Sequence, residues 1–243
     1  MNFNVGILIF FLFPLTCFCQ EKNPPVQITP LTENFYIFTT WNTYNGTPFP
    51  SNGMYAVTSN AVVMIDTPWD TTQVNPLLDS IEARHHKKVI LCVATHFHDD
   101  RTGGFEILKK AQVETWSSEL TKLYCIKNNN PLPNRTFLKD TIFQIDGLRF
   151  EIFYPGPAHS PDNIVVWFPQ QKILYGGCMI KSVDSGGLGN LSDADTHSWG
   201  NSIKNIQKKY PKPRFIIPGH QDWNSTISLK HTLQLLSKAE KAK

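Results

Sequence analysis

The chain has 243 residues, of which 41% are hydrophobic, 18% are charged and 12% are aromatic. This length and composition exclude a small disulfide-stapled scaffold, a disordered chain and a coiled coil. The 23 Lys and Arg residues against 20 Asp and Glu residues leave a formal net charge of +3. Since no basic block stands out, we expect no nucleic-acid partner.

The amino terminus differs from the rest of the chain. Residues 5–15 form an apolar run with the length of a signal-peptide core, too short to cross a bilayer as a helix. We therefore expect residues 1–19 to be removed as a signal peptide and residues 20–243 to form a single domain, exported to the periplasm without stable membrane insertion. A lipid anchor on Cys17 or Cys19 is the less favoured alternative, because neither follows a Gly, Ala or Ser.

The mature chain then keeps the cysteines Cys92, Cys125 and Cys178, which is an odd number and too few for a disulfide framework. At least one thiol is therefore free in an oxidising compartment. A free thiol there is a liability unless it is buried or bound to a metal. We expect Cys92 and Cys125 to be core residues, and a disulfide between Cys178 and one of them is an alternative.

The predicted elements of the first half alternate between strand and helix. Strands are predicted at residues 35–39, 54–58 and 61–66, with a hairpin at Ser59-Asn60. Apolar residues at helical spacing then predict a helix over residues 70–84, followed by an apolar strand at 88–94. Further helices are predicted up to Lys110 and from Ser117 to about Lys127, before a polar break at 128–133.

The second half repeats this alternation. Its predicted strands lie at residues 141–144, 148–154, 164–168, 172–175 and 214–217. Helices are predicted from about Thr196 to Lys209 and from Thr226 onward. Strands outnumber helices and are joined both by tight turns and by helices. This pattern predicts an α/β fold with four αββα layers, in which helices cover two packed mixed sheets.

A cluster of candidate metal ligands follows the predicted strand at 88–94. His96, His98 and Asp100 alternate along one short loop, so a single turn presents two imidazoles and a carboxylate. Three further donors also follow apolar strands and Gly-containing turns: His159, Cys178 and His220. Six such donors match three protein ligands for each of two tetrahedral Zn²⁺ ions, with the remaining position left for a shared water.

The remaining histidines lack this setting. His85 and His86 lie in the charged exit of a predicted helix, where cations suit the helix dipole. His197 and His231 fall within polar helical stretches. We interpret all four as surface residues.

The chain resembles the metallo-β-lactamase family over essentially the whole mature sequence. The shared motifs are His-x-His-x-Asp at residues 96–100, Gly-Pro-x-His-x-Pro-Asp-Asn at 156–163, Gly-Gly-Cys-x-Ile-Lys at 176–181 and Gly-His at 219–220. In the subclass that it resembles, three histidines hold one zinc, and an Asp, a Cys and a His hold the other. Most of the wider fold family has a His directly after the Asp. Here that position is Arg101, and Cys178 supplies the missing donor.

The resemblance implies specific ligand sets. His96, His98 and His159 match the three-histidine zinc site, and Asp100, Cys178 and His220 match the other. It also implies hydrolysis of the β-lactam amide bond of penicillins, cephalosporins and carbapenems by metal-bound hydroxide, giving antibiotic resistance. Zinc coordination can lower the pKa of water from about 15.7 toward 7, so no serine nucleophile is needed.

Other roles carried by the resemblance concern the substrate. Lys181 matches the family position that pairs with the antibiotic carboxylate, and Asn190 matches the residue that polarises the developing oxyanion. Asp100 is expected to be a ligand that also steers water or a proton. The segment 41–49, with Trp41 and Phe49 at its ends, matches a mobile flap that contacts substrate and lies between two strands.

Asp66, Thr95 and Arg101 are expected to orient the ligands without being catalytic. Nothing in the sequence calls for an obligate partner, so we expect a monomer. Two other functions stay open. One is a zinc hydrolase of the same fold that acts on a thioester, lactone or phosphoester, and the other is a non-enzymatic zinc-binding protein.

Overall fold

The computed structural model describes residues 23–138 and 140–241, so the predicted signal peptide lies outside the described residues. A seven-stranded sheet has its strands in sequence order. These strands are β1 (Gln27–Thr32), β2 (Phe35–Tyr44), β3 (Thr47–Val57), β4 (Val62–Ile65), β5 (Val89–Val93), β6 (Glu114–Ser118) and β7 (Arg135–Phe137). The neighbouring pairs from β1 to β4 are antiparallel, and those from β4 to β7 are parallel.

The second sheet has five strands in the order β12-β11-β10-β9-β8. Its strands are β8 (Thr141–Ile145), β9 (Leu148–Phe153), β10 (Val165–Phe168), β11 (Ile173–Gly177) and β12 (Phe215–Pro218). Only the β11–β12 pair is parallel. Both sheets are therefore mixed, as the sequence predicts.

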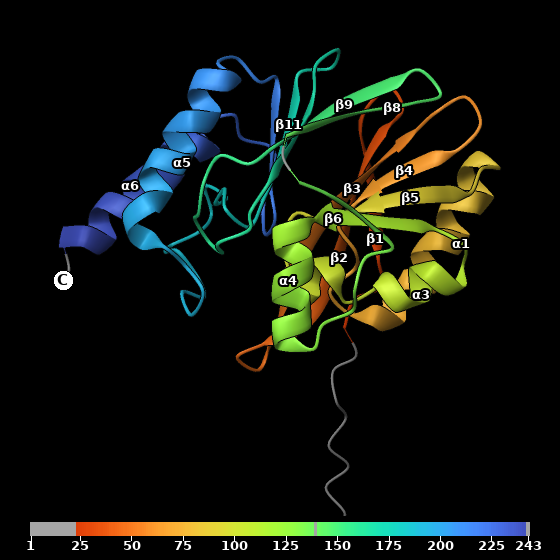
Figure 1. Cartoon of the computed structure of the whole chain (residues 1–243), viewed down its shortest axis with the longest axis horizontal. Coiled ribbons are helices and arrows are strands. Elements are labelled where there is room, and N and C mark those ends of the chain that lie inside the picture. Colours follow the sequence, from red (N-terminus) through yellow and green to blue (C-terminus); the bar gives the residue numbers. More distant parts are fainter. Residues whose placement is uncertain (1–22, 139, 242–243) are drawn as a thin grey trace, which may run out of the picture.

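Helices flank the two sheets. They are η1 (Thr71–Gln73), α1 (Val74–His85), α2 (Asp99–Thr102), α3 (Phe105–Lys110), α4 (Glu119–Asn128), α5 (Thr196–Lys209) and α6 (Ser228–Lys241). In Figure 1, α5 and α6 lie on one side of the two sheets, and α1 and α3 lie on the other. The predicted four-layer αββα architecture is confirmed.

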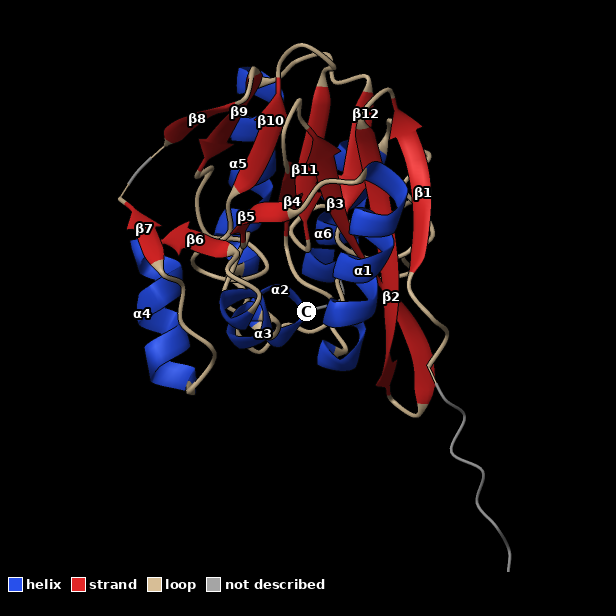
Figure 2. Cartoon of the chain, turned by 90° about the vertical axis from the view of Figure 1, so that its right-hand side faces the viewer, coloured by secondary structure: helices blue, strands red, loops and turns tan. Residues whose placement is uncertain are grey.

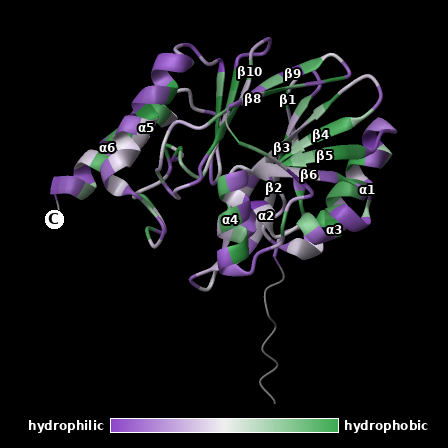
Figure 3. Cartoon of the chain, in the orientation of Figure 1, coloured by the Kyte–Doolittle hydropathy of each residue, from purple (hydrophilic) through white to green (hydrophobic). Residues whose placement is uncertain are grey.

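Three apolar clusters hold the layers together. One lies between the sheets and includes Ile37, Ile65, Phe150 and Tyr175. The second packs α5 and α6 onto the five-stranded sheet, and the third packs α1 and α3 onto the seven-stranded sheet. Burial of this apolar surface is the main favourable contribution to folding. In Figure 3 the apolar colouring follows the strands, whereas the outward surfaces of α5 and α6 are largely hydrophilic.

The predicted flap is itself part of a β-hairpin. Residues 41–44 and 47–49 belong to β2 and β3, and only Asn45 and Gly46 form the turn, both with positive φ (50° and 78°). Pro48 and Pro50 hide this strand in the sequence. They are tolerated because this part of β3 pairs only with β2, so the side that lacks an N–H has no second strand to bond. The long β2 strand is visible in Figure 2.

Other boundaries also differ from the sequence prediction. The strands β1, β6 and β7 were not predicted, because they are short or carry polar residues that obscure the alternation. Ser117 lies in β6 and does not open α4. The helix begins at Glu119, with the Ser118 hydroxyl accepting a hydrogen bond from the Thr121 N–H. The turn at Ser59-Asn60 is confirmed, with the Thr58 N–H donating to the Ala61 carbonyl. Within the described part of the chain, no helix is long and apolar enough to cross a membrane.

Candidate metal centre and substrate cavity

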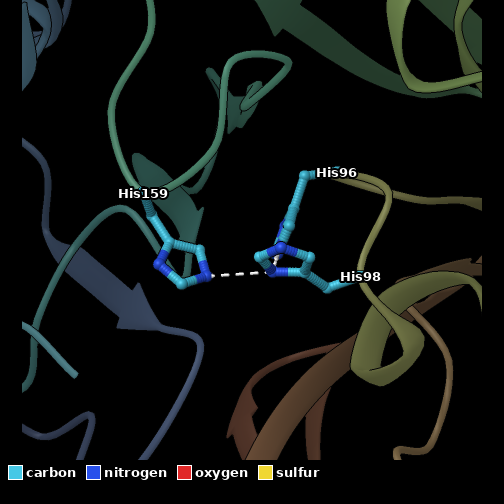
Figure 4. Close-up of side chains that lie close together, drawn as sticks. All are labelled: His96, His98 and His159. Atoms are coloured by element: carbon cyan, nitrogen blue, oxygen red, sulfur yellow. Dashed lines mark hydrogen bonds between the residues drawn. The ribbon is translucent and has the colours of Figure 1, made fainter. Parts of the chain in front are cut away.

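The three predicted histidines converge from two segments. His96 and His98 follow β5, and His159 lies in the loop between β9 and β10. His98 Nδ1 lies 3.1 Å from His96 Nε2 and 3.1 Å from His159 Nε2 (Figure 4). One ring nitrogen can donate at most one proton, so His98 Nδ1 cannot form both hydrogen bonds as the donor. Three nitrogens facing one point are, by contrast, the arrangement that a cation requires.

The second predicted group lies next to the first. Asp100 Oδ2 is 3.1 Å from His220 Nε2 and 3.4 Å from the Cys178 sulfur, and that sulfur is 3.3 Å from His220 Nε2. Potential ligand atoms of His96, Asp100 and Cys178 also lie within 4.8 Å of one another. The two groups therefore adjoin through His96, and the structure brings all six predicted donors together.

Hydrogen bonds at the far side of two rings set their tautomers. His220 Nδ1 donates to the Pro50 carbonyl at 2.9 Å, and His98 Nε2 donates to the Asp193 carboxylate at 3.1 Å. A neutral ring with one nitrogen protonated leaves a lone pair on the other. The free lone pairs are thus His220 Nε2 and His98 Nδ1, which face the two donor groups.

Burial sets the charge states of several donors. It lowers the pKa of His96 and His159 well below the usual value, and it lowers that of His220, so these rings stay neutral and available as ligands. For Asp100, burial alone would raise the pKa, but Arg101 and His220 together hold it well below its usual range. The Asp100 carboxylate is therefore ionised.

Cys178 behaves differently because its buried thiol is neutral. Burial raises its pKa, and the neighbouring Arg101 only partly opposes this effect. A thiolate consequently requires the additional positive charge of a cation bound beside it. Cys92, Cys125 and Cys178 are all free and buried, which contradicts the alternative that Cys178 forms a disulfide with one of the other two.

Arg101 and Asp66 form the buried support beneath the second group. Arg101 is 0% exposed, and its Nη2 lies 3.0 Å from the Cys178 sulfur and 2.9 Å from Asp100 Oδ2. Its Nη1 lies 3.3 Å from Asp66 Oδ2. Asp66 in turn accepts hydrogen bonds from the Thr95 N–H and hydroxyl and from the Tyr175 hydroxyl. The sequence singled out Asp66, Thr95 and Arg101, but not Tyr175.

Both donor groups contribute to the wall of a cavity of about 610 Å³, with every donor residue except the fully buried His96 lining it. Of the predicted substrate residues, Lys181, Asn190 and Phe49 line it, and Trp41 does not. Adjacent residues of a strand point to opposite faces, and Trp41 pairs with Pro50, whereas Asn42 pairs with Phe49. Tyr44 and Trp69 contribute the other aromatic rings of this wall, and Phe49 lies 5.3 Å from the His220 ring, between centroids.

Lys181 and Asn190 differ in their exposure within the cavity. Lys181 is 8% exposed, and burial lowers its pKa while Cys178 and Asp100 raise it. Asn190 is exposed, and its Oδ1 accepts a hydrogen bond from the Ser192 N–H at 3.0 Å. The amide nitrogen of Asn190 is thereby left to donate.

Sequence reasoning missed Asp193, which lies three residues after Asn190 on the same loop and contacts His98. Its position near a predicted cavity residue could have indicated a role in the site. The contact with His98 was not predictable, because 95 residues separate the two in the sequence. The predicted surface histidines His86 and His197 are exposed. His85 and His231 are half-buried, with His85 beside the Tyr55 hydroxyl and His231 beside the Ser185 carbonyl.

Known proteins share this sequence and fold. The family model of the metallo-beta-lactamase superfamily matches residues 46–220. A metallo-beta-lactamase type 2 of Elizabethkingia meningoseptica is 43% identical over 231 residues, covering 95% of this chain and 92% of that protein. Another metallo-beta-lactamase type 2, from Bacillus cereus, is 36% identical over 217 residues, covering 89% of this chain and 85% of that protein. A solved metallo-beta-lactamase structure from Pontibacter korlensis is 40% identical with a TM-score of 0.85, covering 87% and 99%. This chain belongs to the metallo-β-lactamase superfamily.

Proposed function

We propose that the protein is an exported zinc β-lactamase that hydrolyses the cyclic amide of β-lactam antibiotics and thereby gives resistance to them. The observation that carries this proposal is the meeting of two adjacent donor groups in the wall of a cavity of about 610 Å³. Penicillins, cephalosporins and carbapenems are the proposed substrates. The resulting function is that of a hydrolase, as family membership indicates.

The donor spacing fits zinc. Four ligands at about 2.0–2.3 Å in a tetrahedron lie about 3.3–3.8 Å from one another. The donor separations of 3.1 Å in the histidine group and 3.1–3.4 Å in the second group are close to that geometry. We assign His96, His98 and His159 to one zinc and Asp100, Cys178 and His220 to the other, which gives two zinc ions per chain.

When bound, zinc acidifies water and polarises a carbonyl group, which supplies the nucleophile and part of the oxyanion stabilisation. The residues of this chain supply the remaining functions. Lys181 presents an ammonium to the substrate carboxylate, and the Asn190 amide nitrogen donates to the carbonyl oxygen as negative charge develops there. Asp100 combines its role as a ligand with orientation of the attacking water, and Phe49 packs against apolar parts of the substrate.

The cellular setting belongs to the same proposal. The apolar run at residues 5–15 supports export to the periplasm as a mature chain, and we propose that this chain is a monomer.

Hydrolysis of nitrocefin by the mature chain tests the function. We expect turnover that a chelator abolishes and Zn²⁺ restores. Turnover by protein shown to contain no metal would contradict the mechanism, and no turnover of any β-lactam by the zinc-loaded protein would contradict the function.

A matched pair of cysteine variants tests the ligand assignment. Cys178→Ser should reduce the zinc content from about two ions to about one per chain and lower the activity. Cys125→Ser, which alters a buried cysteine in α4, should retain both metals. Equal zinc contents in the two variants would contradict the assignment of Cys178.

A further inference from the structure

The Lys181 ammonium is held in a way that the β-lactamase proposal does not explain. The side chain is buried, and within residues 23–138 and 140–241 its Nζ takes part in no ion pair or hydrogen bond. Besides the electrostatic effects of neighbouring charged groups such as Cys178 and Asp100, Nζ interacts with the ring of Trp199, whose centroid lies 5.3 Å from it. A cation over an indole face is attracted by the negative charge at the ring face, most strongly where water is excluded.

Trp199 is itself held in place. It lies in α5, is 0% exposed, and donates a hydrogen bond from Nε1 to the Met179 carbonyl at 2.9 Å. Met179 lies two residues before Lys181, so one indole contacts both the backbone of this segment and the ammonium at its end. The same ring also lies 6.0 Å from the His159 ring, between centroids.

Two further contacts restrict the lysine. The Lys181 N–H donates to the Thr232 hydroxyl of α6 at 2.8 Å, which fixes the backbone from which the side chain extends. A Cβ built at Gly189, where φ is +75°, would lie 3.6 Å from Lys181 Nζ. The ammonium therefore lies close to both the Trp199 ring and the backbone of the loop that carries Asn190.

We propose that Trp199 is a positioning residue for substrate binding, which holds the Lys181 ammonium in the cavity so that it meets the carboxylate of a β-lactam. This inference rests on the proposed function. A lysine has a flexible four-carbon stem, and ordering it on binding costs conformational entropy. A ring that orders the stem beforehand reduces that cost at the moment of binding. Trp199 thus acts through Lys181 and touches no reacting atom.

The competing role is packing alone, since Trp199 belongs to the apolar cluster under α5 together with Ile203 and Ile206. The two roles differ in which kinetic constant changes. Loss of packing lowers the stability of the enzyme, which affects the turnover of every substrate alike. Loss of positioning raises KM for substrates that carry the carboxylate and leaves those without it unaffected.

The experiment compares Trp199→Phe, Trp199→Leu and the packing control Ile203→Ala in the full mature enzyme. The two substrates are a cephalosporin with its free carboxylate and the methyl ester of the same compound. For the free acid we expect KM to rise about five- to thirty-fold in Trp199→Leu and less in Trp199→Phe, which keeps a π face. We expect kcat within about two-fold of wild type, because no zinc ligand changes. Ile203→Ala should lower Tm without raising KM.

Two further measurements separate positioning from a general defect. In a Lys181→Met background, Trp199→Leu should have no additional effect on KM. Zinc content by mass spectrometry should stay at the wild-type level in every Trp199 variant. An equal rise in KM for the ester, an undiminished effect in the Lys181→Met background, or zinc lost in step with activity would overturn the inference.

These outcomes are distinguishable from failure of the proposed function. If the zinc-loaded wild-type protein hydrolyses neither substrate, both proposals fall. If the wild type hydrolyses both and Trp199→Leu binds the free acid as well as the wild type does, only the role of Trp199 falls.

Discussion

Arg101 Nη2 lies 3.0 Å from the sulfur of Cys178, a residue 77 positions later in the chain. The same guanidinium contacts the carboxylates of Asp100 and Asp66, and all three side chains are buried. One cation in α2 thus connects the segments that follow β4 and β11. It stabilises the negative charge of Asp100, and it partly opposes the rise that burial causes in the pKa of Cys178.

Removing this cation should weaken both the fold and the metal group. Arg101→Ala leaves Asp66 and Asp100 as buried carboxylates without their ion-pair partner, which typically costs about 3–5 kcal/mol. We therefore expect a lower midpoint in urea unfolding and a reduced zinc content. The control is Arg135→Ala, which breaks an exposed pair with Glu114 (N–O 3.0 Å) and should cost less than about 1 kcal/mol. Similar losses in both variants would contradict the role given to Arg101.

Asp193 should strengthen metal binding by His98. Its carboxylate accepts from His98 Nε2, which keeps the lone pair of Nδ1 directed at the other histidines. Loss of such a partner typically lowers metal affinity about 10–100-fold, so Asp193→Ala should release zinc to a competing chromophoric chelator more readily. The control Asp184→Ala alters an exposed carboxylate in the loop between β11 and α5, and this variant should release zinc to the chelator as the wild type does. Unchanged zinc affinity in Asp193→Ala would refute this prediction.

The cavity wall distinguishes Phe49 from Trp41. Phe49→Ala removes an apolar ring that lines the cavity, and a lost contact worth about 1 kcal/mol raises KM about five-fold for β-lactams with apolar side groups. Trp41→Ala removes a ring that does not line the cavity, so KM should stay near wild type. Steady-state kinetics of both variants checks this. A larger effect on KM from Trp41→Ala would show that this residue contacts substrate after all.

The start of α5 provides a pH-dependent stability prediction. The Asp195 carboxylate caps the helix by accepting from the Ser198 N–H at 2.8 Å, and this bond lowers the pKa of Asp195 below its ordinary value of 3.8. Asp195→Ala should lower the free energy of unfolding at neutral pH by about 1 kcal/mol, and Asp195→Asn by much less.

The sign of the pH dependence follows from the direction of that shift. Because the folded-state pKa is below the unfolded-state value, the stabilisation is complete above the unfolded-state pKa and is lost as the pH falls through the folded-state pKa. The difference between wild type and Asp195→Ala should therefore shrink as the pH falls below about 4. Urea unfolding of the metal-free proteins across this range measures it. If the difference in the free energy of unfolding between the two proteins increased as the pH fell, this would contradict the capping role.

The four-layer fold and the donor types were predictable from local sequence. Apolar runs such as β5 and β11 are buried strands, and the polar donors come directly after them, so periodicity alone located both. The spacing of His96, His98 and Asp100 is a local property of one short segment, which is why the sequence indicated metal chemistry. Contrary to the prediction, the segment is not a single loop, because Asp100 lies in α2. Short or polar strands such as β6 were missed because burial there depends on the neighbouring strands and not on local alternation.

Relations between distant residues were decided only by the tertiary structure. The contacts of Arg101 with Cys178, of Asp193 with His98 and of Trp199 with Lys181 span 77, 95 and 18 positions, and no periodicity links them. The sequence by itself determined which donor groups the chain possesses and which elements carry them. The packing of the two sheets and their helices decided which buried charge faces which donor, because those distances depend on the chain as a whole.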